Sequence, residues 1–428
     1  MCPINVDKIK TILHNRLFLL GTPVVEQRRT FWSLTVGLID GWKNEAANTK
    51  NVACLLHSSN GEALFLESFD LTGIKETAIE LSNIVDKCIS LALEKHSTHI
   101  YAVISDNAAN MIKMGKLTTI WHLTCNSHTA NLLAKDLVSK TLVEKAKVLL
   151  KAFHGPDAEK ELLNQGGRRI QMPCDTRWCT YRDSFKNLLD NVTPMKKVLV
   201  ISTILFNETV HTYLFDTIFL KQISDSIELF NPICELINIS QKSTSSIADA
   251  AQAWLDLDLP NKISNDSEGF DAIIKKFKRR QNYALNKYLL TANFLHPKYQ
   301  GKKMTPEHKD IIEDFILNSA EIGTEGLNSF IEYKEKTGLF KILFEKQGLS
   351  TTAFWSFTKN KHPELQGLAN KLLNLPASTG QLERVFSNWS YIHNSLRNRL
   401  NPERSRKLLS TYYSLKLNEK TQSSSNEY

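Results

Sequence analysis

The sequence lacks the features that mark secreted, membrane-bound or nucleotide-driven proteins. Its first residues, MCPINVDKIK, contain no apolar segment of the kind found in signal peptides. The best apolar run, residues 198–206, is too short and too mixed to span a bilayer, so we expect no membrane partner. Neither common type of glycine-rich phosphate loop is present, which argues against a nucleotide-driven enzyme.

The cysteines do not form the pattern of a disulfide framework. There are seven, an odd number, and they are scattered from Cys2 to Cys234. Such usage is typical of a reducing compartment, the cytosol or the nucleus. The sequence has no internal repeat, and its one low-complexity part is the polar tail at residues 418–428, for which we expect disorder.

The remaining composition is that of an ordinary globular protein with room for two or three domains. The chain has 428 residues, of which 42% are hydrophobic and 23% are charged. Lysine and arginine exceed aspartate and glutamate by 53 − 45 = 8. This mildly basic balance is compatible with a nucleic-acid partner but does not establish one.

Five apolar runs are predicted to be strands: residues 33–39, 52–57, 63–69, 100–105 and 120–124. The Asn60-Gly61 pair predicts a hairpin between the second and third strands. Apolar residues at helical spacing predict a helix over residues 74–95. Three strands, a helix, and two strands separated by helices is the order of an RNase H-like α/β core with a mixed sheet, although the order alone does not distinguish it from other mixed α/β folds.

The rest of the chain divides by its patterning. Residues 140–366 are almost wholly helical in pattern, which predicts a large all-α insertion, with a serine-rich loop at 241–246. We therefore predict five parts: a helical lead-in (1–24), the first half of the core (25–139), the insertion (140–366), a completion of the core by C-terminal helices (367–417) and the tail (418–428).

One helix is predicted to begin near Thr379, because Ser378 and Gln381 have the spacing of a capping box. Its apolar stripe consists of Val385, Trp389, Ile392 and Leu396. Glu383 falls away from that stripe and projects elsewhere. The alternative is a glutamate that only interacts favourably with the helix N-terminus.

Two aspartates follow predicted strands. Asp40 comes after the first strand and Asp106 after the fourth, and functional sites of open α/β sheets lie beyond the carboxyl ends of strands. Each has a plain alternative. Asp40-Gly41 has the composition of a turn, and Asp106 is a suitable N-cap for a helix starting near Asn107.

Several motifs together resemble the hAT-type DNA transposases. The string Glu383-Arg384-Val385-Phe386-Ser387, followed by LRNRL at 396–400, resembles the C-terminal dimerisation block of that family. Its other motifs have counterparts in Asp40-Gly41-Trp42, Ser105-Asp106-Asn107, Cys125-x-x-His128, Thr176-Arg177-Trp178 and the string ANFLHPKY at 292–299, where His296 stands in place of the usual aspartate. The first half also resembles the domain once catalogued as DUF659.

The resemblance implies an RNase H-like fold whose catalytic triad is Asp40, Asp106 and Glu383. Three carboxylates held together need a compensating cation, and oxygen donors suit Mg²⁺ or Mn²⁺. Two such ions would support phosphodiester cleavage and strand transfer on DNA. A domesticated, catalytically inactive DNA-binding or dimerisation protein on the same fold is the alternative. The zinc finger with which the family's chains begin has no counterpart in the sequence.

Other residues are expected to support this chemistry. His128 would lie near the scissile phosphate or a carboxylate, although helix packing also explains it. We expect no zinc, since Cys125 and His128 lack a second ligand pair. By the resemblance, Trp178 stacks on DNA, and Arg177, Trp42, Arg397 and Arg399 are further predicted DNA contacts. Filling a core is the alternative for both tryptophans.

Residues 275–303 contain nine basic residues and no acidic one. This run predicts contacts with the phosphate backbone, a solvated helix face being the alternative. The predicted contacts are Lys275, Lys276, Lys278, Arg279 and Arg280.

A final helix over residues 402–417 carries more apolar residues than one buried stripe requires. We therefore predict a homo-oligomer, unless the insertion covers both faces of this helix. The resemblance to DNA transposases implies that the protein acts in the nucleus. The predicted dimerisation residues are Leu408, Leu409, Tyr412 and Tyr413.

Overall fold

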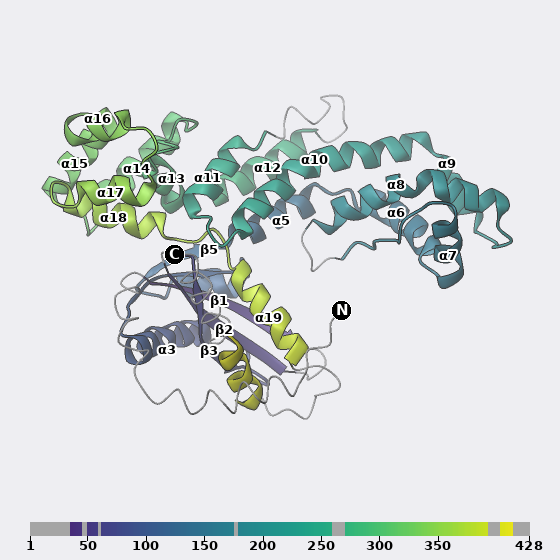
Figure 1. The fold of residues 1–428 in the computed structure, drawn as a ribbon, viewed down its shortest axis with the longest axis horizontal. Coiled ribbons are helices and arrows are strands. Elements are labelled where there is room, and N and C mark those ends of the chain that lie inside the picture. Colours follow the sequence, from purple (N-terminus) through teal and green to yellow (C-terminus); the bar gives the residue numbers. More distant parts are fainter. Residues whose placement is uncertain are drawn as a thin grey trace, which may run out of the picture.

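The computed structural model describes residues 35–44, 49–58, 61–174, 179–258, 270–392 and 403–413. A mixed sheet with its helices forms one body, and a long layer of helices lies along one side of it (Figure 1). The predicted lead-in and tail, Thr176-Arg177-Trp178, Arg397 and Arg399 lie outside the described residues. In the part of the chain that is described, no helix is long and apolar enough to cross a membrane.

The five strands form one sheet in the order β3-β2-β1-β4-β5. The first three are antiparallel to one another, and β1–β4 and β4–β5 are parallel. Gly61, with φ +80°, supplies the left-handed conformation of the predicted hairpin. The prediction of five strands and a mixed α/β sheet is confirmed. The strands are β1 (Thr35–Asn44), β2 (Thr49–Ser58), β3 (Ala63–Asp70), β4 (Ile100–Ser105) and β5 (Trp121–Thr124).

Strand β1 is longer than predicted. It pairs with β2 over its whole length, from Thr35 opposite Ser58 to Asn44 opposite Thr49. Asp40 therefore lies within the strand, and both its placement at a strand end and the turn alternative are wrong. The sequence hides this extension because Asp40-Gly41 has turn composition, whereas ladder pairing with β2 keeps these residues extended.

Side chains of β1 point alternately to the two faces of the sheet, and each face has its own hydrophobic core. Ile39 faces α3 (Ala78–His96) and α4 (Ala109–Gly115), where it packs with Val85 and Met114. Val36 and Leu38 face the other way and join the core that includes α5 (Asn126–Leu137) and the insertion. Because successive strand residues point to opposite faces, Asp40 shares the face of Val36 and Leu38.

The described part of residues 140–366 contains helices and no strand, as predicted. Figure 1 shows these helices as the extended layer beside the sheet. They are α6 (Lys140–Phe153), α7 (Pro156–Asn164), α8 (Thr180–Ile201), α9 (Glu208–Phe215), α10 (Thr217–Gln241), α11 (Ile247–Asp256), α12 (Phe270–Ala284), α13 (Lys287–Leu295), α14 (Pro306–Leu317), α15 (Thr324–Glu335), α16 (Gly338–Glu345), α17 (Thr351–Thr358) and, reaching beyond residue 366, α18 (Pro363–Leu373).

The chain returns to the sheet through a junction around Asn126, the first residue of α5. Its backbone N–H and its side-chain amide both donate to the carbonyl of Ala377, each at 3.1 Å. Its amide oxygen accepts the indole N–H of Trp254 on α11 at 3.3 Å. Buried hydrogen bonds of this kind fix the point at which α19 (Gly380–Ile392) begins.

Candidate active site

Asp40 lies within β1, and Asp106 directly follows the neighbouring strand β4. Leu38 of β1 pairs with Ile104 of β4 in parallel register, so Asp40 and Asp106, each two residues further on, lie beside each other. The carboxylate of Asp106 accepts the backbone N–H of Ala108 at 3.1 Å. Ala108, not Asp106, is the N-cap residue of α4, so the simple N-cap alternative for Asp106 is wrong.

Helix α19 brings Glu383 to the same region. Leu382 and Val385 are fully buried against the core, and Phe386 stacks on Trp42 of β1 with ring centroids 5.8 Å apart. These contacts hold the first turn of the helix, which carries Glu383, against β1. The predicted apolar stripe is present in Val385 and Trp389, the part of it whose side chains are described.

The predicted capping box is wrong, although α19 begins within one residue of the predicted start. The hydroxyl of Ser378 accepts the N–H of Gly380 and donates to the carbonyl of Ser240. The side chain of Gln381 lies 3.3 Å from the His57 imidazole and donates to the carbonyl of Gly61 at 3.1 Å. Gln381 therefore ties the helix to the β2–β3 hairpin instead of capping it.

Asp40 lies within electrostatic reach of the other predicted site residues. It is only 7% exposed. Burial raises its pKa well above the ordinary value, and Asp106 and, more weakly, Glu383 raise it further, while His128 opposes them. Charges influence one another in this way when they lie near each other in a poorly hydrated environment. The structure thus places Asp106, Glu383 and His128 around Asp40.

The carboxylate of Glu383 is partly buried and one of its oxygens lacks a hydrogen bond. Burial raises its pKa to about 7, although His128 and Arg384 act in the opposite direction. Its Oε1 is buried and has no hydrogen-bond partner among the residues that the structure describes. A buried acceptor in this state calls for a bound group that satisfies it.

Cys125 and His128 form a pair beside the carboxylates. Burial alone would raise the pKa of the Cys125 thiol, but His128 and the amide of Thr379, 3.4 Å from the sulfur, hold it below the usual value. Burial alone would lower the pKa of His128. Cys125, Asp40 and Glu383 outweigh burial and raise it to about 10, so His128 is an imidazolium at neutral pH.

The donor set fits a hard divalent cation in its chemistry. The site contains three carboxylates, of which Asp40 has a raised pKa and Glu383 an oxygen without a hydrogen-bond partner. A bound cation would stabilise the ionised carboxylates and bind to this oxygen. Within the described residues, however, no three His, Cys, Asp or Glu side chains are close enough together to hold a metal ion. Small side-chain movements, or oxygens of a bound phosphodiester, would therefore have to complete the coordination.

Two family models match the chain. The Domain of unknown function (DUF659) matches residues 26–152, which include Asp40, Asp106 and His128. The hAT family C-terminal dimerisation region matches residues 334–415, which include Glu383. Together the two matches support a transposase-like protein of the hAT family. No curated protein matches it.

Trp42 of this hAT-family chain is engaged in packing. Its ring lies between β1 and α19, 5.8 Å from Phe386 and 5.1 Å from Trp389, measured between centroids. Aromatic neighbours on this scale anchor one element on another. The contacts favour the packing alternative for Trp42, and its contact with DNA stays a prediction.

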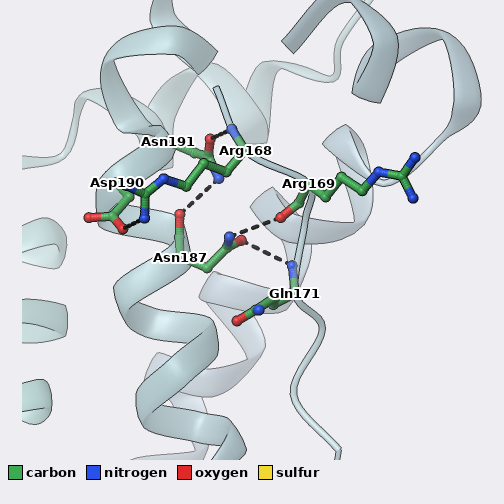
Figure 2. A network of polar contacts seen from close by, with 6 residues as sticks. All are labelled: Arg168, Arg169, Gln171, Asn187, Asp190 and Asn191. Atoms are coloured by element: carbon green, nitrogen blue, oxygen red, sulfur yellow. Dashed lines mark hydrogen bonds and ion pairs between the residues drawn. The ribbon is translucent and has the colours of Figure 1, made fainter. Parts of the chain in front are cut away.

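The segment that leads to Thr176-Arg177-Trp178 is anchored on α8 (Figure 2). Asn191 accepts the backbone N–H of Arg168 at 2.7 Å, and Asn187 binds the carbonyl of Arg169 and the N–H of Gln171. The guanidinium of Arg169 points away from this network. The segment at residues 168–171 is thus fixed in position, and Arg169 is a basic residue in it that sequence reasoning missed.

The predicted DNA contacts of the basic run fall into two groups, residues that bind Asp136 and residues that are free to meet DNA. The carboxylate of Asp136 on α5 accepts hydrogen bonds from the guanidinium groups of Arg279 and Arg280, at 3.1 and 2.7 Å. The backbone carbonyl of Asp136 accepts a hydrogen bond from the ammonium group of Lys276. Arg280 is largely buried in this pair. Three of the five predicted DNA contacts therefore hold α12 against α5. Lys275 and Lys278 are exposed and remain candidates.

The predicted dimerisation residues also divide. In the helix at residues 403–413, Leu409 is fully buried within the monomer, and the hydroxyl of Tyr413 accepts the side-chain amide of Asn388 at 2.9 Å. Leu408 and Tyr412 are 44% and 42% exposed. The intermolecular prediction is therefore wrong for Leu409, whose burial within the monomer the sequence pattern does not reveal, and it stays a prediction for the half-buried Tyr413.

Replacing Glu383 by Gln is expected to change the pH dependence of stability. A carboxyl whose pKa rises from 4.5 to about 7 on folding binds more protons in the folded state between these values. Its contribution to stability is complete below pH 4.5 and is lost as the pH rises through 7. Relative to wild type, Glu383→Gln should therefore gain free energy of unfolding from pH 4.5 to 7 and level off above it. Urea titrations at several pH values measure this.

The control is Glu94→Gln, which removes an exposed carboxyl on α3. It shows what the loss of one surface charge does by itself. A difference from wild type that stays flat across this pH range for Glu383→Gln would contradict the buried environment described above.

Proposed function

We propose that this chain cleaves DNA phosphodiester bonds and transfers strands, with Asp40, Asp106 and Glu383 holding Mg²⁺ or Mn²⁺. The observation that carries the proposal is that the buried Asp40 lies within electrostatic reach of both Asp106 and Glu383, although Glu383 is 383 − 40 = 343 residues away in the sequence. Like charges at one buried place lower stability, and perturbed groups of this kind cluster at functional sites. The strand order β3-β2-β1-β4-β5 supports an RNase H-like core as the scaffold.

The residues have separate roles in this proposal. Divalent ions, when bound, would polarise the scissile phosphate and lower the pKa of the attacking water or 3′-hydroxyl. Asp40, Asp106 and Glu383 would bind them in the ionised form, so metal binding would release the proton that Glu383 holds near pH 7. The imidazolium of His128 would attract the phosphate and orient it toward the carboxylates.

An inactive, domesticated DNA-binding protein is the second candidate. It is favoured by one observation: within the described residues the side chains do not form a ready three-ligand metal site. In that case the carboxylates would be a retained feature of the fold, and DNA binding and self-association would be the function. In either case the chain would act in the nucleus, where its DNA partner is.

The activity is expected to depend on each carboxylate. Asp40→Asn, Asp106→Asn and Glu383→Gln should each lower Mg²⁺-dependent nicking of hairpin and duplex DNA by at least about 100-fold, because even an outer-shell partner of a metal ligand contributes 10–100-fold. DNA affinity in the absence of metal should stay within a few-fold of wild type. Asp86→Asn, an exposed carboxyl on α3, is the matched control and should retain activity. Absence of metal-dependent nicking by the wild type would favour the inactive alternative.

DNA affinity should depend on salt through the exposed part of the basic run. Each phosphate contact contributes a slope of about −0.9 to log K against log[salt], so Lys275→Gln with Lys278→Gln should flatten the slope by about 1.8. Arg280→Gln should instead lower the free energy of unfolding, because it leaves Asp136 without its nearest partner. Fluorescence anisotropy at four salt concentrations measures the slope. An unchanged slope in the double variant would exclude both lysines as phosphate contacts.

Self-association is expected to use the exposed side of the helix at residues 403–413. The double variant Leu408→Asp with Tyr412→Asp should convert an oligomer into a folded monomer, because apolar anchors contribute much of the energy of an interface. Leu409→Asp should unfold the protein, since it buries a charge. Size exclusion with light scattering, together with thermal unfolding, separates the two outcomes. A wild-type monomer at micromolar concentration would contradict the prediction.

A further inference from the structure

A cavity lined by aromatic residues lies away from the carboxylates, between residues of α13, α14 and the start of β5. It has a volume of about 230 Å³ and is lined by Trp121, Tyr288 and Phe315. Trp121 is the first residue of β5, whereas Cys125, beside the carboxylates, follows the last. The cavity is therefore separate from the candidate active site.

The three rings surround the cavity at steep angles. Their centroids are 5.2 Å apart for Trp121–Tyr288, 5.4 Å for Tyr288–Phe315 and 6.3 Å for Trp121–Phe315. The corresponding interplanar angles are 41°, 74° and 65°. The rings pack on one another and do not form a parallel slot. The faces of Tyr288 and Phe315 are turned toward one point, because the ammonium of Lys287 lies over both rings.

The charges around the cavity favour a cation. Asp314 and Glu321 lie in its lining. The ammonium of Lys287 already lies 5.2 Å from the ring centroids of both Tyr288 and Phe315. Lys371 lies 5.9 Å from the centroid of Trp121 and pairs with Glu321 at 2.9 Å. The chain's own ammonium groups thus show that these rings attract positive charge.

We propose that this cavity binds a methylated ammonium group, of the kind carried by a trimethyl-lysine side chain or by choline. Methylation keeps the positive charge but removes the N–H donors, so such a group loses little hydration when aromatic rings surround it. The cavity is smaller than the roughly 300–1,000 Å³ of pockets for drug-sized ligands, which suits a compact head group. The exposed side chain of Lys287 swings out as the ligand enters.

A nucleobase or phosphate fits this cavity less well. Base stacking uses the flat face of a ring, and the steep angles between the three rings leave no parallel pair to receive a base. The carboxylate of Asp314 repels a phosphate, and Lys371, which could attract one, is already paired with Glu321. The observations therefore favour a cationic ligand over DNA at this place.

The test is isothermal titration of the full chain with four probes: a trimethyl-lysine peptide, the same peptide with unmodified lysine, the same peptide with a neutral tert-butyl isostere, and choline. The trimethyl-lysine peptide should bind at least about tenfold more tightly than the other two peptides. Comparable binding of choline would identify the head group as sufficient, and its absence would show that the peptide contributes.

Variants assign the binding to the cavity. Tyr288→Leu removes one ring, retains apolar volume and should weaken binding by about two- to fivefold, the loss expected for one ring. Asp314→Lys, at an exposed position, should weaken it further. Lys287→Ala should strengthen binding, because it removes the internal competitor. Lys336→Ala, which removes an ammonium 5.2 Å from the remote Phe344 ring, is the matched control and should have no effect.

Thermal unfolding checks that each variant is folded. The proposal is overturned if the wild type binds neither the trimethyl-lysine peptide nor choline at millimolar concentration. It is also overturned if the neutral isostere binds as well as the cation, or if Asp314→Lys and Lys287→Ala, both at exposed positions, bind like the wild type. DNA binding by the same variants is measured in parallel, and a loss of DNA affinity in Tyr288→Leu without any peptide binding would assign the rings to nucleic acid instead.

Discussion

The buried amide of Asn126 joins three parts of the molecule that are far apart in the sequence. It binds the carbonyl of Ala377, 251 residues away, and the indole of Trp254, 128 residues away. The chain leaves the sheet at α5, builds the helical layer, and returns at Ala377. These hydrogen bonds of Asn126 determine where α19 begins and therefore where Glu383 lies relative to Asp40. A buried amide with satisfied partners specifies one arrangement and penalises others, since any shift leaves polar groups unpaired.

The electrostatics of the site oppose the stability of the fold. Asp40 and Glu383 both have raised pKa values, for which burial is the largest cause. The imidazolium of His128 offsets part of this cost, and the thiol of Cys125 with the Thr379 amide holds the imidazolium in place. The surrounding structure must supply the missing stability, and it does so through apolar contacts such as those of Trp42 with α19.

Periodicity in the sequence was sufficient to predict the sheet, the helix at α3 and the helical nature of the insertion, because these depend on burial of local apolar patterns. It failed where a partner comes from a distant part of the chain. Asp136 lies outside the basic run, so its ion pairs with Arg279 and Arg280 were invisible. The bonds of Gln381 to the β2–β3 hairpin and the burial of Leu409 are likewise long-range effects. The grouping of the carboxylates came from family motifs, because no local pattern relates residue 40 to residue 383.

The long interval between the strands and α19 has a consequence for biosynthesis. Sheet strands β1 to β5 can pair as soon as the first 124 residues have emerged, since their contacts are comparatively local. Glu383 is made some 260 residues after that point, which at 5–20 residues per second corresponds to roughly 13–50 seconds of translation. During this interval the nascent chain carries two of the three carboxylates without the third. The order of synthesis itself thus keeps the site incomplete until the insertion has been built and α19 has docked.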